Sequence, residues 1–499
     1  MNMNRMKMIA MISAACLVFT GMTAALSASA EYAAAADTKE TETAKSVSFD
    51  EATGTLTLRR NVDRDDVMDF RQNEAVKKVV CAKGTVLPPV CAYMFDDFCA
   101  ESIDLSNADT SNVENMACMF SGASAKTIDL SSFNTSKVTT MDSMFYGCQE
   151  VTALDLSSFD TSRVTDMTMM FSSCSKLTDL NIRSFDTSSV QKMSNMFAYD
   201  KGLKSLDLSH FKTSNVREMG AMFLYCTGLT ELDLSAFDTS SVQGMSLMFY
   251  ECSGLTRLDL RNFDTSNVIT MAMMFSRCSG LTELNLTSFD TSSVTAMGSM
   301  FWQCSKLTEL DLSSFETASI EDMPASMQQI ADIHDEALGI SHMFEDCPAL
   351  KTIYVSEKWQ LPAALPHSRN IFGGDTALAG GNGTAYADAQ AMPVLETARI
   401  DREGAPGLLT YKESAVPAKG DFDGNGTADL EDAQRVLSSY AKDVAQLENT
   451  LTARQQTAAD VDGDGRVSVE DAQYILRYYT EKQVAGKNIS WSTIVKPGR

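Results

Sequence analysis

One motif recurs from about Cys99 to Leu350, and this repetition constrains the fold more than any other feature of the chain. Its clearest copy is Leu255-Thr-Arg-Leu-Asp-Leu-Arg-Asn-Phe-Asp-Thr-Ser-Asn-Val-Ile-Thr-Met-Ala-Met-Met-Phe-Ser-Arg-Cys278. A Met-Phe pair marks the period, with steps of 25, 25, six of 26 and then 43 between Phe95, Phe120, Phe145, Phe171, Phe197, Phe223, Phe249, Phe275, Phe301 and Phe344. Ten copies at one period predict a solenoid, because a single copy cannot bury its own apolar face.

The pattern inside one copy is typical of a leucine-rich repeat. Leu255, Leu258 and Leu260 have the Leu-x-x-Leu-x-Leu spacing, which predicts a short strand around Leu258–Leu260. The following Asp264-Thr-Ser is expected to cap a short helix, whose buried face would hold Val268, Met271, Met274, Phe275 and Cys278. We therefore expect an α/β solenoid of about ten rungs of 25–26 residues, with the Met/Phe/Cys stripe as its core.

Cysteines occupy one column of the repeat, although Asp200 holds that position in one copy. Adjacent rungs would allow disulfide bridges, but the apolar setting and the tolerated aspartate favour buried free thiols. One cysteine per rung does not bring four ligands to one point, which argues against zinc. The column consists of Cys148, Cys174, Cys226, Cys252, Cys278, Cys304 and Cys347.

The N-terminus indicates secretion. Residues 1–30 have the basic start, the apolar run Met8–Leu26 and the small-residue site Ala28-Ser-Ala30 of a signal peptide. The chain has no second apolar segment long enough to span a membrane. Its net charge of −25 argues against nucleic acid or an anionic membrane as a partner. We expect a secreted, extracellular protein.

Composition divides the rest of the chain. The expected segments are a linker at 31–46, an N-terminal cap at 47–93, the solenoid at 94–350 with an insert at 324–340, a C-terminal cap at 351–412, a small all-α module at 417–482 and a tail at 483–499. The cap is expected because an end rung otherwise exposes its core. Strands are predicted within it at Thr55–Arg59 and Val76–Val80.

The repeat resembles that of the BspA-like surface proteins, a bacterial leucine-rich-repeat family. The shared motif is nearly complete at Leu154–Cys174, and the resemblance extends over about 47–412, including Gly380-Gly-Asn-Gly-Thr384 and Ala398-Arg-Ile-Asp401. Phe159 stands where many leucine-rich repeats carry asparagine, so a phenylalanine spine is expected. The resemblance implies adhesion to hosts or neighbouring cells and brings no catalytic residues.

Two twelve-residue segments near the C-terminus predict a pair of calcium sites. Calcium binds six to eight hard oxygens, and alternate loop positions around a tight glycine turn aim side chains inward. Position 7 contributes its backbone carbonyl, and position 12 a carboxylate. The expected ligands are Asp421, Asp423, Asn425, Thr427, Asp429 and Asp432 in the first loop, and Asp460, Asp462, Asp464, Arg466, Ser468 and Asp471 in the second.

The two loops, each followed by Asp-Ala-Gln and a helix, resemble a type I dockerin over about 417–482. The resemblance implies two bound Ca²⁺ ions and a cohesin partner on a cellulosome-type scaffold. The expected contacts are Leu430, Glu431, Val469 and Glu470, where the best-known dockerins carry a Ser-Thr pair. The near-identity of the halves implies binding in two orientations. The 39-residue spacing of the loops and Ser468 depart from the family pattern.

These features favour a non-catalytic binding or adhesion subunit, in which the solenoid recognises a protein or glycan. None of the four histidines lies in a catalytic motif. A uniform ladder of carboxylates would not separate an acid from a base. Two alternatives stay open: a carbohydrate-active enzyme component, and a structural spacer. Two surfaces also stay open as binding sites, namely the aspartate column that includes Asp155 and Asp233, and the aromatic edge that includes Tyr146, Tyr225 and Trp302.

Overall fold

A computed structural model describes residues 45–321, 339–363, 365, 368–412, 419–422, 428–445, 451, 453–485, 487, 489 and 491–495. These residues form two compact units, each considered by itself. The first contains residues 45–258 and Met273–Leu281; the second contains Asp259–Ala272, 282–321 and the described residues from 339 onward. The expected signal peptide, most of the linker and most of the insert fall outside the described residues.

The first unit begins with a five-stranded sheet. Its order is β1 (Val47–Asp50), β2 (Thr55–Leu58), β3 (Lys78–Cys81), β5 (Ser102–Asp104) and β7 (Thr127–Asp129). β1 is antiparallel to β2, and all later pairings are parallel. The strands predicted around residues 55–59 and 76–80 are therefore present as β2 and β3. Short elements between them are α3 (Arg64–Met68), β4 (Thr85–Val86) and β6 (Ala108–Asp109).

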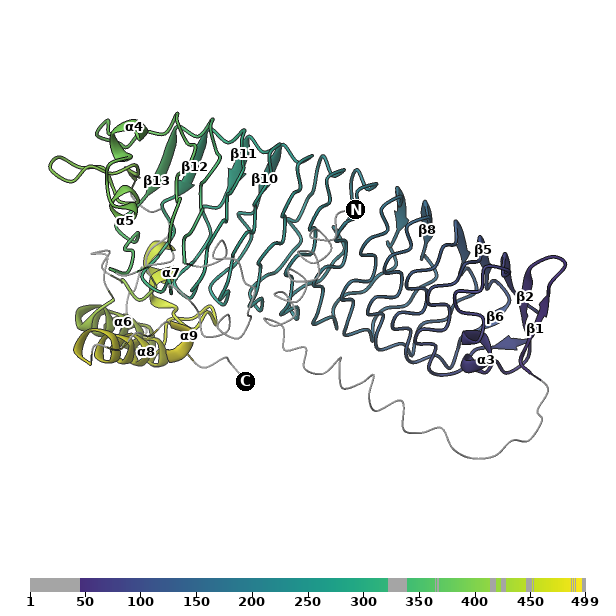
Figure 1. Ribbon diagram of the computed structural model, residues 1–499. Coiled ribbons are helices and arrows are strands. Elements are labelled where there is room, and N and C mark those ends of the chain that lie inside the picture. The colour runs from purple at the N-terminus through teal and green to yellow at the C-terminus, as the bar shows by residue number, and fades with distance from the viewer. Residues whose placement is uncertain are drawn as a thin grey trace. The chain divides into compact units, whose positions relative to one another are not determined.

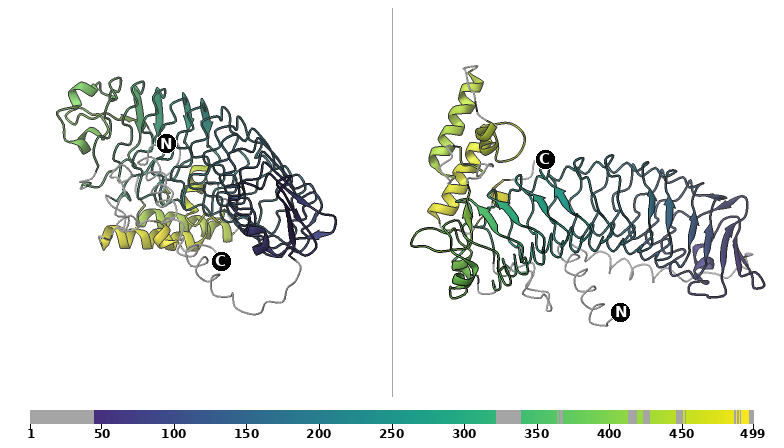
Figure 2. Two further views of the ribbon diagram at one scale, coloured as in Figure 1. Left: turned by 45° about the vertical axis from the view of Figure 1, so that its right-hand side comes forward. Right: turned by 90° about the horizontal axis from the view of Figure 1, so that it is seen from above.

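The repeats contribute strands of only three residues, such as β8 (Ala153–Asp155) and β9 (Asp179–Asn181), which pair in parallel. β10 (Arg257–Asp259) lies at the strand position predicted from the leucine spacing. Figures 1 and 2 show the coils of each unit stacked one on the next. An aspartate or asparagine ends these three-residue strands, and its side-chain oxygen can accept the N–H two residues later, as Asp155 accepts that of Ser157 at 3.1 Å.

The Met-Phe segments are chains of tight turns, so the predicted short helix is wrong in the described repeats. Met119 N–H donates to the Met116 carbonyl at 3.2 Å, three residues back. Phe120 N–H instead donates to Met144 of the next rung at 2.9 Å. Cys118 between them has a φ of 55°, a left-handed conformation that no right-handed helix contains. The corresponding residues Ser143, Met169 and Asn195 share it.

Two columns of phenylalanines fill the core of the first unit. The rings of Phe197 and Phe223 stack at 5.8 Å, and the other Met-Phe rings of this unit stack in the same way at 5.4–5.8 Å. A second column contains Phe159, whose ring lies 6.1 Å from that of Phe133, which confirms the expected phenylalanine spine. Alongside, the described column cysteines are thiols outside any disulfide bond, and Cys148 Sγ donates to the Phe120 carbonyl at 3.1 Å. The free-thiol interpretation agrees with this geometry.

The second unit continues the same construction. β11 (Glu283–Asn285) precedes β12 (Glu309–Leu312), which pairs in parallel with β13 (Thr352–Val355), and β13 pairs with β14 (Thr410–Tyr411). The Phe372 ring stacks on Phe344 at 5.4 Å. Phe372 therefore belongs to a further rung inside the segment that the sequence suggested as a cap, 28 residues after Phe344. The signal was weak because Ile371 replaces the methionine of the Met-Phe pair.

Beyond this rung lie α4 (Tyr386–Ala389) and α5 (Val394–Thr397). The Asp401 carboxylate connects the segments 380–384 and 398–401, which resemble BspA-like proteins in this part of the chain. It accepts the Asn382 N–H at 2.8 Å and the Thr384 N–H at 3.0 Å, with the Thr384 hydroxyl at 2.7 Å. These hydrogen bonds lower the pKa of Asp401 although its burial opposes them. One ionised side chain thus holds the glycine-rich turn in place.

The C-terminal module is helical, with α6 (Leu430–Val444), α7 (Ala453–Ala459), α8 (Val469–Tyr479), the π-helical η3 (Thr480–Val484) and α9 (Trp491–Ile494). Val436 of α6 and Ile475 of α8 are fully buried in its core. The Trp491 ring stacks on Tyr478 at 4.0 Å, so α9 packs in this core although it lies in the expected tail. Among the described residues, no helix is long and apolar enough to cross a membrane.

Candidate metal centre

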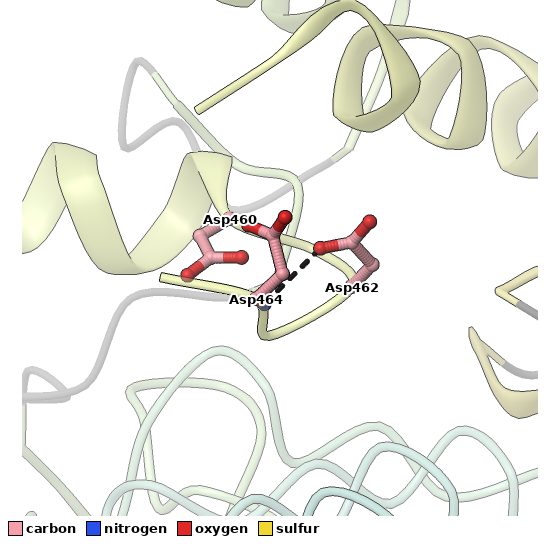
Figure 3. Close-up of side chains that lie close together, drawn as sticks. All are labelled: Asp460, Asp462 and Asp464. Carbon is pink, nitrogen blue, oxygen red and sulfur yellow. Dashed lines mark hydrogen bonds between the residues drawn. The ribbon is translucent and has the colours of Figure 1, made fainter. Parts of the chain in front are cut away.

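Three aspartates of the second loop converge between α7 and α8. Asp460, Asp462 and Asp464 each offer a carboxylate oxygen, and these oxygens lie within 4.8 Å of one another (Figure 3). They hold positions 1, 3 and 5 of the loop predicted from the sequence. Hard oxygens at this spacing are the donors that calcium prefers, so the residues present fit a calcium ion.

Backbone amides shape this loop. Asp460 accepts the N–H of Gly463 at 2.9 Å and of Gly465 at 2.8 Å, and Asp462 accepts that of Asp464 at 3.2 Å. Gly465, at position 6, has a φ of 83°, which glycine adopts without the steric cost of a side chain. The loop therefore curls around its own carboxylates.

Burial raises the pKa of Asp460, and the neighbouring charges of Asp462 and Asp464 raise it further. The three groups repel one another when all are ionised. A divalent cation would reverse this effect and favour their ionised forms. The local electrostatics thus favour the binding of a divalent cation such as calcium.

Ser468 and Asp471, at positions 9 and 12, do not join the cluster in this structure. Asp471 is buried, and its carboxylate accepts the N–H groups of Val461 at 2.9 Å and Ser468 at 2.7 Å. The two residues form a capping box at the start of α8. Burial raises the pKa of Asp471 to about 6. Arg466 was expected to act through its carbonyl; its N–H donates to Asp464 at 2.8 Å.

The first loop is described only at its ends, and Asp423, Asn425 and Thr427 lie outside the described residues. Asp421 is buried in the module. Asp429 N–H donates to the Asp432 carboxylate at 2.8 Å, and these two residues form a capping box at the start of α6. Asp429 thus caps its helix as Ser468 caps α8, so the serine preserves this structural role.

The four expected contact positions open the two long helices. Leu430 and Glu431 begin α6, and Val469 and Glu470 begin α8. Leu430, Glu431 and Glu470 are exposed, and Val469 is half-buried. Each pair is followed along its helix by exposed apolar side chains that were not predicted from the sequence. Seven-residue spacing, which keeps residues on one face, was the available signal, and it relates Leu430 to Leu437 and Val444, and Val469 to Leu476.

The two surfaces left open on the repeats contain side chains that already make contacts within the repeats. The Asp207 and Asp233 carboxylates accept hydrogen bonds from Ser209 and Ser235, which lower the pKa of each aspartate. On the aromatic edge, the rings of Tyr199 and Tyr225 stack at 4.9 Å, and Tyr225 lies in a small apolar cluster. Most of these side chains serve turns and packing.

Comparison with solved structures finds weak similarities. The chain is 17% identical to a chain of the TLR13–ssRNA13 complex, with a TM-score of 0.23, covering 65% of this chain and 53% of that one. It is 15% identical to an LRR protein of Leptospira interrogans, with a TM-score of 0.18, covering 52% and 71%. It is 14% identical to a leucine rich cell surface protein of Faecalibacterium prausnitzii, with a TM-score of 0.21, covering 69% and 100%.

The chain spans about half the length of the first of these chains. No curated protein sequence matches it. Among protein families, residues 419–479 match the dockerin type I domain, so the C-terminal module is a dockerin. Residues 90–181, 176–257 and 227–339 match a second family and together run without a gap over half of the chain. The chain therefore belongs to the family described as Mycoplasma protein of unknown function, DUF285.

Proposed function

We propose that this chain is a secreted, non-catalytic binding subunit that a cohesin holds on a cellulosome-type scaffold. The observation that carries the proposal is the dockerin module, with its two helix starts at Leu430 and Val469 and the carboxylate cluster beside the second. A dockerin gives a protein its location. The repeats supply the rest of the chain's surface and therefore its recognition.

Calcium would be held by Asp460, Asp462, Asp464 and Asp471 in the second loop, with the carbonyl of Arg466 and the Ser468 position completing the set. The first loop would hold a second ion through Asp421, Asp423, Asn425, Thr427, Asp429 and Asp432. The ions supply charge neutralisation, which lets the acidic loops close against the helices. The loops and their capping boxes then fix the directions in which the helices α6 and α8 extend from the loops.

The cohesin would contact Leu430 and Glu431 in one orientation, and Val469 and Glu470 in the other. Two features support this assignment. Each pair begins a helix at a capping box of the same geometry, and each continues into exposed apolar side chains, Leu437 on α6 and Leu476 on α8. Apolar side chains at the centre of an interface, with charged groups such as Glu431 beside them, are the usual anatomy of protein recognition.

The repeats would recognise a protein or glycan partner, in keeping with their resemblance to BspA-like surface proteins. A stacked array presents the same side-chain positions at each rung, about 4.8 Å apart, which suits an extended ligand. Several copies on one scaffold would raise the effective concentration, so that weak single contacts suffice.

An array of glycans and surface proteins, probed with the full chain captured on immobilised cohesin in calcium, tests both halves of the proposal. We expect capture in calcium, release in EDTA and binding to at least one class of ligand. Failure of capture by every cohesin from the same organism would contradict the scaffold role. Capture without any ligand would leave a spacer, and turnover of a polysaccharide or protein substrate would favour the enzyme alternative.

A further inference from the structure

A polar pocket lies on the first unit, away from the metal centre. Its volume is about 370 Å³, and its lining comes from four successive repeats: Thr165, Ser188, Ser189, Gln191, Asn215, Arg217 and Ser241. Every lining side chain is a hydroxyl, an amide or a guanidinium, and none is acidic. The lining therefore carries the positive charge of Arg217 and no negative charge.

Hydrogen bonds between rungs fix the floor of the pocket. Gln191 N–H donates to the Thr165 carbonyl at 2.9 Å, and Arg217 N–H donates to the Gln191 carbonyl at 2.9 Å. The side chains of Thr165, Gln191 and Arg217 therefore rise from one column at successive rungs. Three rung steps at about 4.8 Å give a site of roughly 14 Å, long enough for a short oligosaccharide.

A second column supplies oriented acceptors. Ser189 Oγ donates to the Ser162 carbonyl, Asn215 Nδ2 to that of Ser188 and Ser241 Oγ to that of Ser214, each at 2.7 Å. Each of these side chains therefore uses one hydrogen-bond donor in a contact with the preceding rung. The oxygens of Ser189, Asn215 and Ser241 keep lone pairs that can accept from a ligand's hydroxyl groups.

In the first column the Thr165 hydroxyl donates to the Thr139 carbonyl at 3.2 Å, but the other two side chains keep their donors. Within the part of the chain that the structure describes, neither the Arg217 guanidinium nor the Gln191 amide has a side-chain hydrogen bond or ion pair. Two carboxylates close in sequence to the lining residues are already paired, Asp166 with Lys192 at 3.2 Å and Asp186 with Lys212 at 3.6 Å. Arg217 is therefore available to a ligand anion.

We propose that this pocket binds a carboxylated sugar, such as a uronic or sialic acid unit of a glycan. The guanidinium of Arg217 matches a carboxylate in two parallel hydrogen bonds, and Gln191 adds a donor beside it. The hydroxyl groups of the sugar then donate to the column of Ser189, Asn215 and Ser241. The absence of aromatic side chains from the lining makes this recognition polar rather than stacking. The inference deepens the proposed function, on which it rests, by naming a ligand class.

Isothermal titration of the full chain in calcium tests the site with four probes: tri-galacturonate, 3′-sialyllactose, the neutral lactose and a tri-glutamate peptide. We expect at least one acidic sugar to bind at a ratio of one to one, and lactose and the peptide to bind at least tenfold more weakly. Which acidic sugar binds more tightly identifies its source. The proposal would be overturned if neither acidic sugar bound at millimolar concentrations, or if the tri-glutamate peptide bound as tightly as the acidic sugars.

The variant Arg217→Gln should weaken the acidic sugar at least tenfold. Its matched control is Arg257→Gln, which removes an exposed arginine of strand β10 and should leave the affinity unchanged. Equal affinity of Arg217→Gln and the wild type would also refute the site. If the chain still bound other ligands on the array of glycans and surface proteins, only the assignment of this pocket would be refuted. If it bound no ligand on that array, the proposed recognition role would be refuted as well.

Discussion

The Asp375 carboxylate accepts the backbone N–H of Cys347 at 2.7 Å inside the core of the second unit. Asp200 does the same for Cys174 at 2.8 Å in the first unit. Both aspartates occupy the cysteine column, and both are fully buried. Burial raises the pKa of Asp200 well above its usual range and that of Asp375 to about 8. Each therefore substitutes for a cysteine as a neutral acid.

The pH dependence of stability should reveal Asp375. Below pH 4 the group is protonated in both the folded and the unfolded chain. From pH 4 to about 8 the unfolded chain loses this proton and the folded chain keeps it, so the free energy of unfolding should fall as pH rises. The loss should be roughly 3–6 kcal/mol for one such group. Urea unfolding of the repeats at several pH values measures it.

Asp375→Asn should make that slope shallower by the contribution of one group, because the amide keeps an acceptor for Cys347 and does not titrate, while Asp200 still does. Asp388→Asn, which removes the same charge from an exposed site on α4, should retain it. The same slope in Asp375→Asn and the wild type would mean that this carboxyl does not hold its proton in the folded chain.

The phenylalanine columns should dominate the stability of the repeats. Phe223 is fully buried, and its ring stacks on Phe197 at 5.8 Å and on Phe249 at 5.7 Å. Phe223→Ala should lower the free energy of unfolding by about 3–5 kcal/mol. The exposed Ser235→Ala should change it by less than about 0.5 kcal/mol. Chemical denaturation compares the two, and equal effects would show that the inward face is misassigned.

Removal of calcium should unfold the dockerin module alone. The acidic loops repel themselves without a cation, and an ion that binds only the folded state stabilises it by mass action. In calorimetry, EDTA should lower the midpoint of the transition that exposes Trp491, while the transition of the repeats keeps its midpoint. A module midpoint unaffected by EDTA would exclude calcium as its structural ion.

Gly465 should be needed for its backbone conformation. A Cβ there would meet no atom within 4 Å, so only the φ of 83° opposes a side chain. Gly465→Ala should cost the module about 1–2 kcal/mol and weaken calcium binding. Gly244→Ala adds the same methyl group in equally open space where φ is not in the left-handed region, and should be neutral. Calcium titration and thermal melts of both variants make the comparison.

The stacked fold was predictable because its signal repeats. Every copy carries the same leucines and the same Met-Phe pair, so the strand near Leu258 and the spine through Phe159 followed directly. The turn segment was not predictable, because Val-x-x-Met-x-x-Met-Phe has a three-residue spacing close to that of a helix. The left-handed residue at Cys118 and the hydrogen bonds to the next rung, as from Phe120 to Met144, distinguish the two, and these hydrogen bonds depend on neighbours that one copy does not contain.

The metal centre was predictable to the same degree. Asp460, Asp462 and Asp464 converge because their alternate spacing is local. The capping role of Ser468 and Asp471 and the packing of Trp491 against Tyr478 depend on how α8 and the segment after it fold back. The polar pocket at Arg217 was not predictable either, because apart from Ser188 of the repeated Asp-Thr-Ser motif its residues occupy positions that vary between copies.

Surface plasmon resonance of paired variants against a cohesin from the same organism tests the central claim most directly. Replacing only one pair by alanine, either Leu430 with Glu431 or Val469 with Glu470, should reduce the affinity only about twofold, because the other helix start still binds. Replacing all four should abolish calcium-dependent capture while the module keeps its melting temperature. Wild-type affinity in the fourfold variant would contradict the assigned contacts, and no binding by the wild type to any cohesin of that organism would contradict the scaffold role itself.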